Sequence, residues 1–250
     1  MPDPTLVAIV GAVFLLAGLV KGVLGLGLPT VAIGLLGTVM RPAEAAALLV
    51  VPTLVTNLWQ LFTGPAFTGL IRRLWPMMAG ICLGTALGQW ADLGLSGGNA
   101  GRASVALGLI LVVYAVIGLA RVRLHVPPGA EWWAGPLAGT VTGLISGATG
   151  VFVIPSVPYL QAIGLTRDDL VQALGLTFTV AIVALAAGLA RDGEMSAAAT
   201  GASLLALAPA LVGVVAGGRV REAVHPETFR RWFLIGLIGL GIHLVLKGFR

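Results

Sequence analysis

The chain contains apolar runs that are too long and too poor in charge for the interior of a soluble protein. The stretch from Ala103 to Ala120 holds no charged residue, and only 10% of the 250 residues are charged, against about 25% in soluble domains. A hydrocarbon core of about 30 Å needs about 20 apolar residues per helix. Six segments fit that length: 42–63, 72–91, 102–120, 167–190, 196–218 and 229–248. The sequence therefore predicts an all-α polytopic membrane protein.

Two further stretches, 6–39 and 132–165, are too long for one crossing and only just long enough for two, and Gly and Pro interrupt both. They resemble each other. At an offset of 125 residues, Gly18, Gly22 and Gly25 match Gly143, Gly147 and Gly150. At an offset of 126, Pro29, Arg41 and Thr53 match Pro155, Arg167 and Thr179. At an offset of 129, Gly84 and Gly88 match Gly213 and Gly217. We predict a tandem duplication, with a first repeat at 1–121, a joint at 122–131 and a second repeat at 132–250.

Two arrangements of the interrupted stretches are open. If each crosses once, the chain has eight spans, and its basic residues divide seven against seven between the two faces. If each enters and returns, each half makes five passes, the halves are inverted, and both chain ends lie on the face with fewer basic residues. That arrangement puts Arg72, Arg73, Arg121, Arg123, Arg167, Arg219, Arg221, Arg230 and Arg231 on one face and Arg41, Arg102, Arg191, Lys247 and Arg250 on the other. Cytoplasmic loops carry an excess of Lys and Arg. We therefore expect two inverted structural repeats, with about 8 to 10 membrane segments that include interrupted or re-entrant hairpins.

Lys21 lies within the first interrupted stretch. An ammonium at the bilayer centre costs at least about 2.5–3.5 kcal/mol on insertion scales. Its four-carbon stem could carry the amine to the headgroups; alternatively, the amine lines an internal cavity and attracts an anion. Gly22, Gly25 and Gly27 favour the cavity, because a chain without Cβ atoms can turn inside the protein and present backbone N–H groups. A helix that restarts near Pro29 would direct its positive end to the same place. We predict that Lys21 and these three glycines bind an anion.

The second half has hydroxyl groups at the equivalent turn, where the first half has an ammonium. We predict that four residues there also bind the substrate: Ser146, Gly147, Thr149 and Gly150. Close helix packing of the GxxxG type is the alternative explanation for such glycines. It is our expectation for a separate set, namely Gly80, Gly84, Gly88, Gly213 and Gly217.

The segment that follows each interrupted stretch carries polar residues deep in apolar sequence. Thr53, Thr56, Asn57 and Gln60 fall on one broad face of a helix, and Gln172, Thr177 and Thr179 lie in the matching segment. Such a face either lines a cavity or forms hydrogen bonds between helices. We predict that Thr53, Asn57 and Thr179 contribute to substrate binding.

Several other functions find no support in the sequence. The net charge of +5 is spread singly or in pairs between apolar segments, which excludes a nucleic-acid-binding face. His125, His225 and His243 have no ligand spacing for a metal and no neighbouring nucleophile, and Cys82 is the single cysteine. We therefore expect neither an enzyme nor a bound metal or other cofactor.

No carboxylate lies clearly within a predicted membrane segment, where a proton-coupled transporter usually keeps one. We therefore expect passage driven by the solute gradient and the membrane potential. A monovalent anion that leaves a negative-inside cell gains about 2.3 kcal/mol per 100 mV. Export is the easier direction for such a solute.

The sequence resembles the TauE/SafE family, also called the toluene sulfonate uptake permease family, over its whole length. The resemblance is carried by the length, the duplication, the string from Gly18 to Pro29, the Arg41-Pro42-Ala-Glu44-Ala segment and the string from Gly143 to Pro155. Members often have consecutive glycines where this chain has Gly25-Leu26-Gly27-Leu28. The resemblance implies transport of sulfite, sulfoacetate or another organosulfonate across the cytoplasmic membrane of a prokaryote.

We therefore expect a multi-pass protein of the cell inner (cytoplasmic) membrane that exports a small sulfur-containing anion by alternating access. The expected partners are this small anionic substrate and the lipid bilayer; nucleic acid is excluded, and a homodimer is compatible with the sequence. Three alternatives stay open: an anion channel, a transporter for another small solute such as a carboxylate, and a membrane component that assembles with a partner without transporting anything.

Overall fold

A computed structural model describes residues 4–91, 100–120 and 124–249. These residues form ten α-helices and one short 3-10 helix, with no β-strand among them. The first half holds α1 (Pro4–Leu24), α2 (Leu28–Leu36), α3 (Pro42–Phe62), α4 (Phe67–Trp90) and α5 (Ala100–Leu119). The second half holds η1 (Pro128–Ala130), α6 (Glu131–Thr149), α7 (Ser156–Ala162), α8 (Arg167–Arg191), α9 (Ala197–Ala223) and α10 (Pro226–Gly248). The prediction of an all-helical chain is confirmed.

The interrupted stretches are helix pairs that turn at three of the predicted glycines, whereas Gly22 lies within α1, where a Cβ would overlap the carbonyl oxygen of Val214 on α9. Gly25 and Gly27 have φ values of +76° and +105°, and Gly150 has a φ of +72°, a region that favours glycine because it has no Cβ. Helix α2 restarts at Leu28 with Pro29 in its first turn, as predicted. Residues 121–123, at the end of the predicted first repeat and the start of the predicted joint, lie outside the described residues.

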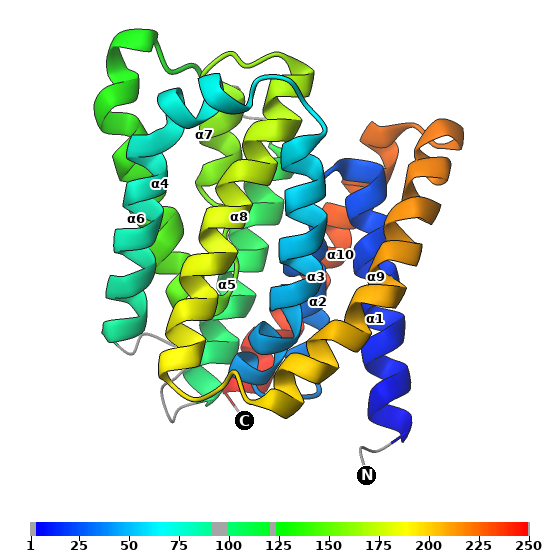
Figure 1. Cartoon of the computed structure of the whole chain (residues 1–250). Helices are drawn as coiled ribbons and strands as arrows, with labels where there is room; N and C mark the ends of the chain where they lie inside the picture. The colour runs from blue at the N-terminus through cyan, green and yellow to red at the C-terminus, as the bar shows by residue number, and fades with distance from the viewer. Residues whose placement is uncertain (1–3, 92–99, 121–123, 250) are drawn as a thin grey trace.

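Each interrupted stretch returns to the end of the bundle from which it started. The Nζ of Lys247, in the last turn of α10, donates to the carbonyl oxygens of Gly37 at 3.1 Å and Thr38 at 2.8 Å, just beyond α2. Figure 1 shows that α1 begins and α10 ends at this same end, the lower one in that view. In the second half, Arg73 binds Glu131, the first residue of α6, and also donates to the carbonyl of Ile163, just after α7.

Facing glycines join α1 to α9 and α4 to α6. A Cβ atom on Gly213 would overlap the carbonyl oxygen of Leu15, and one on Gly84 would overlap that of Thr140. The two contacts are equivalent, because Gly84 matches Gly213 and Leu15 matches Thr140 at the offsets of the duplication. The close packing predicted for Gly80, Gly84, Gly88, Gly213 and Gly217 is therefore confirmed.

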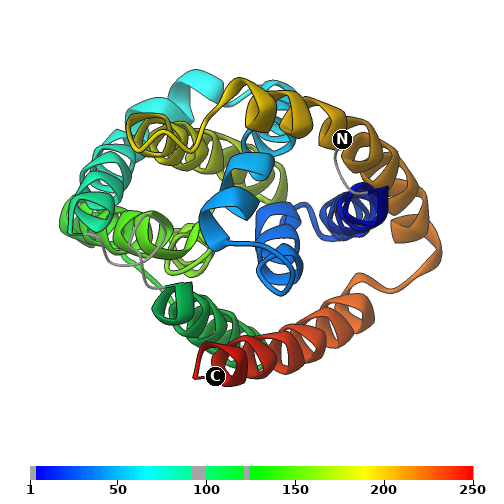
Figure 2. The same ribbon diagram turned by 90° about the horizontal axis from the view of Figure 1, so that it is seen from below.

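The centre of the bundle is occupied by α2 and the start of α3, which Figure 2 shows in blue inside the ring of other helices. Eight of the nine α2 residues are buried. Gln60 on α3 donates to the carbonyl of Val171 at 2.9 Å, and Gln172 on α8 donates to that of Leu61 at 2.8 Å. Helices α3 and α8 run in opposite directions, because Gly175, further along α8, lies against the carbonyl of Asn57, which is earlier on α3. These glutamines hold the two halves together, which is the interhelical alternative that the sequence left open for Gln172.

A side chain of α9 repairs a break in the hydrogen-bond ladder of α3. Pro52 has no N–H, so the carbonyl of Leu48 lacks its usual helical donor. The Ser203 hydroxyl donates to that carbonyl at 2.9 Å and accepts from the N–H of Val51 at 3.1 Å. The α3 helix can therefore carry a proline at its midpoint without an unpaired carbonyl there.

Replacing Ser203 with alanine should destabilise the protein by about 1–3 kcal/mol, because a buried carbonyl then loses its partner. Thermal unfolding of the detergent-purified protein measures this loss. A Ser203→Thr variant keeps the hydroxyl and should retain most of the stability. Equal melting temperatures for Ser203→Ala and the unaltered protein would contradict this assignment.

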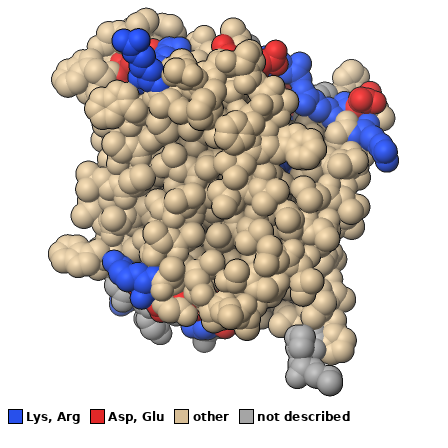
Figure 3. All heavy atoms as spheres, viewed as in Figure 1, with Lys and Arg blue, Asp and Glu red and all other residues tan. Residues whose placement is uncertain are grey.

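The outer surface suits a lipid environment. Among the described residues, six helices are long and apolar enough to cross a membrane, namely α1, α3, α5, α8, α9 and α10. Figure 3 shows Lys and Arg side chains gathered at the two ends of the visible face, with a broad band of uncharged residues between them. The tryptophans that the sequence places near segment ends are 51–79% exposed: Trp75, Trp90, Trp132, Trp133 and Trp232. Such aromatic residues are typical of membrane interfaces.

Candidate functional site

A cleft of about 810 Å³ opens at the end of the bundle opposite the chain ends. Its floor is formed by the last turn of α1 and the turn that follows, from Lys21 to Leu26. Its walls come from the second half of α3, the end of α5, α7, the start of α8, the end of α9 and the start of α10. Both halves of the chain thus contribute to one cavity, and most of its lining side chains are apolar.

Lys21 lies at the base of this cleft and is only 6% exposed. Its Nζ donates to the Thr56 hydroxyl at 3.1 Å and to the Oδ1 of Asn57, both on α3. Thr56 lies six residues before the end of α3, which corresponds to about 9 Å along the helix. The amine is therefore turned inward, away from the headgroups, and lies about halfway between the midpoint of α3 and its end.

The two acceptors leave part of the ammonium free for a ligand. The Thr56 hydroxyl donates its own proton to the carbonyl of Pro52 at 2.7 Å, so it meets Lys21 as an acceptor. A lysine ammonium has three N–H donors, and Thr56 and Asn57 take two of them. Within the described part of the chain, no carboxylate forms an ion pair with Lys21. The third donor has no acceptor among the described residues, and Lys21 lines the cleft floor.

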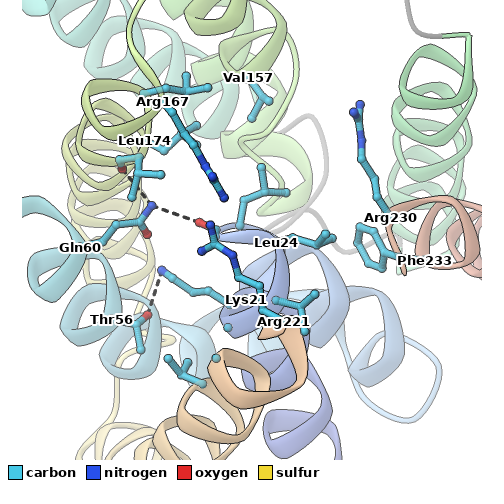
Figure 4. A pocket seen from close by; sticks show the side chains of 18 of the residues that line it. Lys21, Leu24, Thr56, Gln60, Val157, Arg167, Leu174, Arg221, Arg230 and Phe233 are labelled. Carbon is cyan, nitrogen blue, oxygen red and sulfur yellow. Dashed lines mark hydrogen bonds between the residues drawn. The ribbon is translucent and has the colours of Figure 1, made fainter. Parts of the chain in front are cut away.

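Gln60 fixes the turn beside Lys21. Its Nε2 donates to the carbonyl of Gly25 at 3.1 Å and to that of Val171 on α8 at 2.9 Å. The side chain is 9% exposed and also lines the cleft. Because both amide hydrogens are used, the turn at Gly25 is tied to α8 across the cavity, as the dashed lines in Figure 4 show.

Three arginines line the cleft near its mouth. Arg167 is the first residue of α8, Arg221 is near the end of α9, and Arg230 is in the second turn of α10. In Figure 4 the guanidinium groups of Arg167 and Arg221 point toward the space above Lys21, and Arg230 stands beside Phe233 on the other side. Glu227 is the one carboxylate among the described lining residues. The cleft therefore carries a surplus of positive charge.

The first half supplies three of the predicted site residues to the cleft, namely Lys21, Gly22 and Gly25. Gly27 lies next to them, against Val20 and Phe233, but is not part of the wall. Asn57 and Thr53 are fully buried, and Thr53 is next to the midpoint of α3. The polar face of α3 thus continues from the cleft floor into the middle of the bundle.

The predicted residues of the second half lie outside this cleft. Ser146, Gly147, Thr149 and Gly150 are buried at the end of α6, and Gly147 packs against Thr85 and Gln89 of α4. Thr179 donates to the carbonyl of Gly175 within α8 at 2.7 Å. The structure does not bring the two turns together around one cavity.

Thr56 and Gln60 are not among the predicted binding residues, although both fall on the predicted polar face of α3. Arg167, Arg221 and Arg230 are predicted only as charges of one face of the membrane. Their one sequence signal is membership of the more basic face, and that signal does not distinguish the arginines of a cleft mouth from those of other loops.

The family model for sulfite exporters, TauE/SafE, matches residues 10–244. No curated protein and no solved structure matches the chain. The match covers all ten helices apart from the first residues of α1 and the last of α10. Members of this family are membrane transporters rather than enzymes. The chain is a multi-pass membrane protein and belongs to the sulfite exporter TauE/SafE family.

Proposed function

We propose that this protein exports a small sulfur-containing anion, such as sulfite, sulfoacetate or another organosulfonate, across the cell inner membrane. The observation that carries the proposal is Lys21, an ammonium that neutral acceptors hold at the floor of an open cleft. A buried charge without a counter-ion is costly, and an anion would offset that cost. The family supports a sulfur oxyanion or sulfonate as this anion.

The electrostatics of the cleft favour an anion over a cation or a neutral solute. The described lining residues include four cations, Lys21, Arg167, Arg221 and Arg230, and one carboxylate, Glu227. A cleft with low-dielectric walls and one sign of charge concentrates ions of the opposite sign. The arginines would gather the anion at the mouth, and Lys21 would hold it at the floor.

We further propose that the chain consists of two inverted repeats, 1–121 and 132–250, with ten membrane segments, of which the nine-residue α2 and the seven-residue α7 belong to re-entrant hairpins and do not cross. The opposite directions of α3 and α8 support this arrangement, as do the returning helix pairs α1–α2 and α6–α7 and the repeated glycine contacts. Inverted repeats are typical of secondary transporters that work by alternating access. A homodimer stays a prediction.

The distribution of basic residues supports export. Arg72, Arg73, Arg167, Arg219, Arg221, Arg230 and Arg231 lie near the end of the bundle where the cleft opens. Arg121 and Arg123, predicted for the same face, lie outside the described residues. Because the more basic face is cytoplasmic in membrane proteins, the cleft would admit an anion from the cytoplasm. The membrane potential would then favour outward release.

Flux into liposomes that contain the purified protein tests this function. A panel of sulfite, sulfate, sulfoacetate, taurine and matched carboxylates, each with and without a pH gradient and a potential, identifies the substrate and the driving force. We expect saturable flux of a sulfur anion that follows the potential and ignores the pH gradient. Flux of carboxylates alone, or flux that never saturates, would replace this proposal with a different transporter or a channel. A stable complex with a partner and no flux would indicate an assembly component.

The two arginines that point toward Lys21 should act mainly on the rate of anion entry. In a double variant with Arg167→Gln and Arg221→Gln, we expect initial uptake at low ionic strength to fall about 10-fold or more, because steering by charge raises encounter rates by about 10- to 1,000-fold. The remaining rate should depend less on salt, since salt screens exposed charges. Initial rates measured over a range of salt concentrations test both effects.

Arg72→Gln is the matched control for this variant. Arg72 lies near the same end of the bundle, on α4, and does not line the cleft. Its replacement should leave the rate and its salt dependence unchanged. If Arg72→Gln slows uptake as much as the double variant does, the effect belongs to the overall surface charge and not to the cleft mouth.

A further inference from the structure

The two turns of the duplication are open in one half and covered in the other. Gly25 and its match Gly150 share almost the same φ, +76° and +72°. A Cβ atom on Gly25 would meet no atom within 4 Å, because this turn faces the cleft. On Gly150 the same atom would overlap the Cδ1 of Ile33. The side chain of Ile33, on the central helix α2, therefore covers the second turn.

The matching residue of α7 leaves the first turn uncovered. Tyr159 stands at the position of Ile33, at the offset of 126. Its hydroxyl lies beside Gly135 on α6, where it would be 3.0 Å from a Cβ on that glycine. The two short helices thus place equivalent side chains differently, one over its facing turn and one away from it.

A second covering side chain comes from α4. Gln89 matches Gly218 of α9 at the offset of 129, and Gly218 lines the open cleft with no atom within 4 Å of a Cβ placed there. The Gln89 amide lies directly on Gly188 of α8 and donates to the carbonyl of Leu185 at 3.1 Å. Its backbone nitrogen lies beside Gly147. Gln89 therefore fills the space between α4 and α8, whereas its match Gly218 leaves the equivalent space open as part of the cleft.

Unpartnered hydroxyl groups lie next to this closed turn. Ser146, the match of Lys21, is fully buried, and its hydroxyl has no hydrogen-bond partner. The same holds for Thr142, one turn earlier on α6, and for Thr85, whose carbonyl lies against Gly147. Buried polar groups are nearly always paired, and an unpaired one calls for an explanation such as a ligand that binds in another state. Thr142 and Ser146, one turn apart on α6, offer hydroxyl donors that suit an anion.

We propose that the turn from Ser146 to Gly150 is a second position for the transported anion, closed in this conformation by Ile33 and Gln89. This inference rests on the proposed function, and it identifies the side chains that shut the far end of the path. The first position has an ammonium and the second has hydroxyls. Both positions offer hydrogen bonds to an anion, but only the ammonium adds the Coulomb attraction of a full positive charge, so the second position holds the anion less tightly and favours its release.

An ion-pair cluster at the covered end supports the assignment. Arg41, the match of Arg167, bonds to Glu44 at 3.0 Å and lies 3.5 Å from Glu194, in the loop between α8 and α9. Arg167 instead points into the cleft (Figure 4). Arg41 thus forms ion pairs at the covered end, and its match Arg167 points into the cleft at the open end.

Cysteine labelling tests whether Ile33 closes the second position. In a Cys82→Ser background, Ser146→Cys places a thiol at the turn, and a membrane-impermeant methanethiosulfonate reagent is added on the side of the membrane that holds the chain ends. We expect slow labelling. Adding Ile33→Val, which removes only the covering Cδ1 methyl, or Ile33→Ala should increase the labelling rate at least 10-fold. Leu35→Ala, also on α2, is the matched control and should leave the rate low.

The sidedness of the reagent is checked with Thr63→Cys in the same background, because Thr63 lines the cleft and should react only from the opposite side. Unchanged labelling of Ser146→Cys in both Ile33 variants, with Thr63→Cys reacting as expected, overturns the assignment of Ile33. Labelling needs no substrate. A failure here therefore rejects the closure by Ile33 and leaves the proposed function standing, whereas a failure of the anion assay rejects the proposed function and, with it, the role of this turn as an anion position.

Discussion

Lys21→Met protein should bind the transported anion about 10- to 100-fold more weakly than the unaltered protein. A hydrogen bond to a charged group is worth about 1.5–3 kcal/mol, and 1.4 kcal/mol corresponds to a factor of 10 in affinity. Methionine has a similar length but offers no donor and no charge. Isothermal titration of the detergent-purified proteins with sulfite or an organosulfonate measures the difference.

The fold should survive this substitution. Lys21 makes two hydrogen bonds to α3, so the change costs about 1–3 kcal/mol because the buried Oδ1 of Asn57 loses its donor, and removal of a buried charge offsets part of that cost. Lys247→Met is the control, because Lys247 is the other lysine of the chain and binds carbonyl groups beyond α2, away from the cleft. Unchanged affinity in Lys21→Met protein that still folds would assign Lys21 to helix packing alone.

Gly84→Val should prevent stable folding or lower stability by more than about 3 kcal/mol. A Cβ at this position would overlap the carbonyl oxygen of Thr140, and a backbone atom cannot move aside as a flexible side chain can. Overpacking a well-packed contact typically costs about 1–3 kcal/mol, and a clash with backbone belongs at or above the upper end. Gel filtration and thermal unfolding of the detergent-purified protein report the loss.

Gly239→Val is the matched control. Gly239 lies within α10, and a Cβ there would meet no other atom within 4 Å. The same chemical change should therefore leave folding intact, with at most a small gain from the lower flexibility of the unfolded chain. Gly213→Val, at the equivalent contact between α9 and α1, should fail as Gly84→Val does. Normal folding of either packing variant would contradict the backbone contacts.

Local chemistry determines the features that the sequence predicts well. Apolar length defines the long helices, and the glycines at 25, 27 and 150 mark the turns because only glycine adopts positive φ at little cost. The GxxxG packing follows from the same lack of a Cβ. Lys21 is identifiable because a charge within an apolar stretch is costly and needs a compensating role.

The sequence does not predict which cavity is open. Gly25 and Gly150 have equivalent surroundings in sequence, yet one faces a cleft and the other is covered by Ile33. The choice depends on how whole helices tilt against one another, and local patterns carry no information about it. The sequence does not identify the arginines of the cleft mouth for the same reason, because Arg167 and Arg221 come together only when α8 and α9 are placed around α1.

The glycine contacts also limit how this protein can change shape. Because the main chains of α4 and α6 touch, as do those of α1 and α9, neither pair can slide or twist internally without a steric collision. Each pair should move as one stiff rod. Rearrangement is then confined to the contacts of these rods with other helices and to the contact between α3 and α8, where Gln60, Gln172 and Ser203 provide hydrogen bonds that can break and form again.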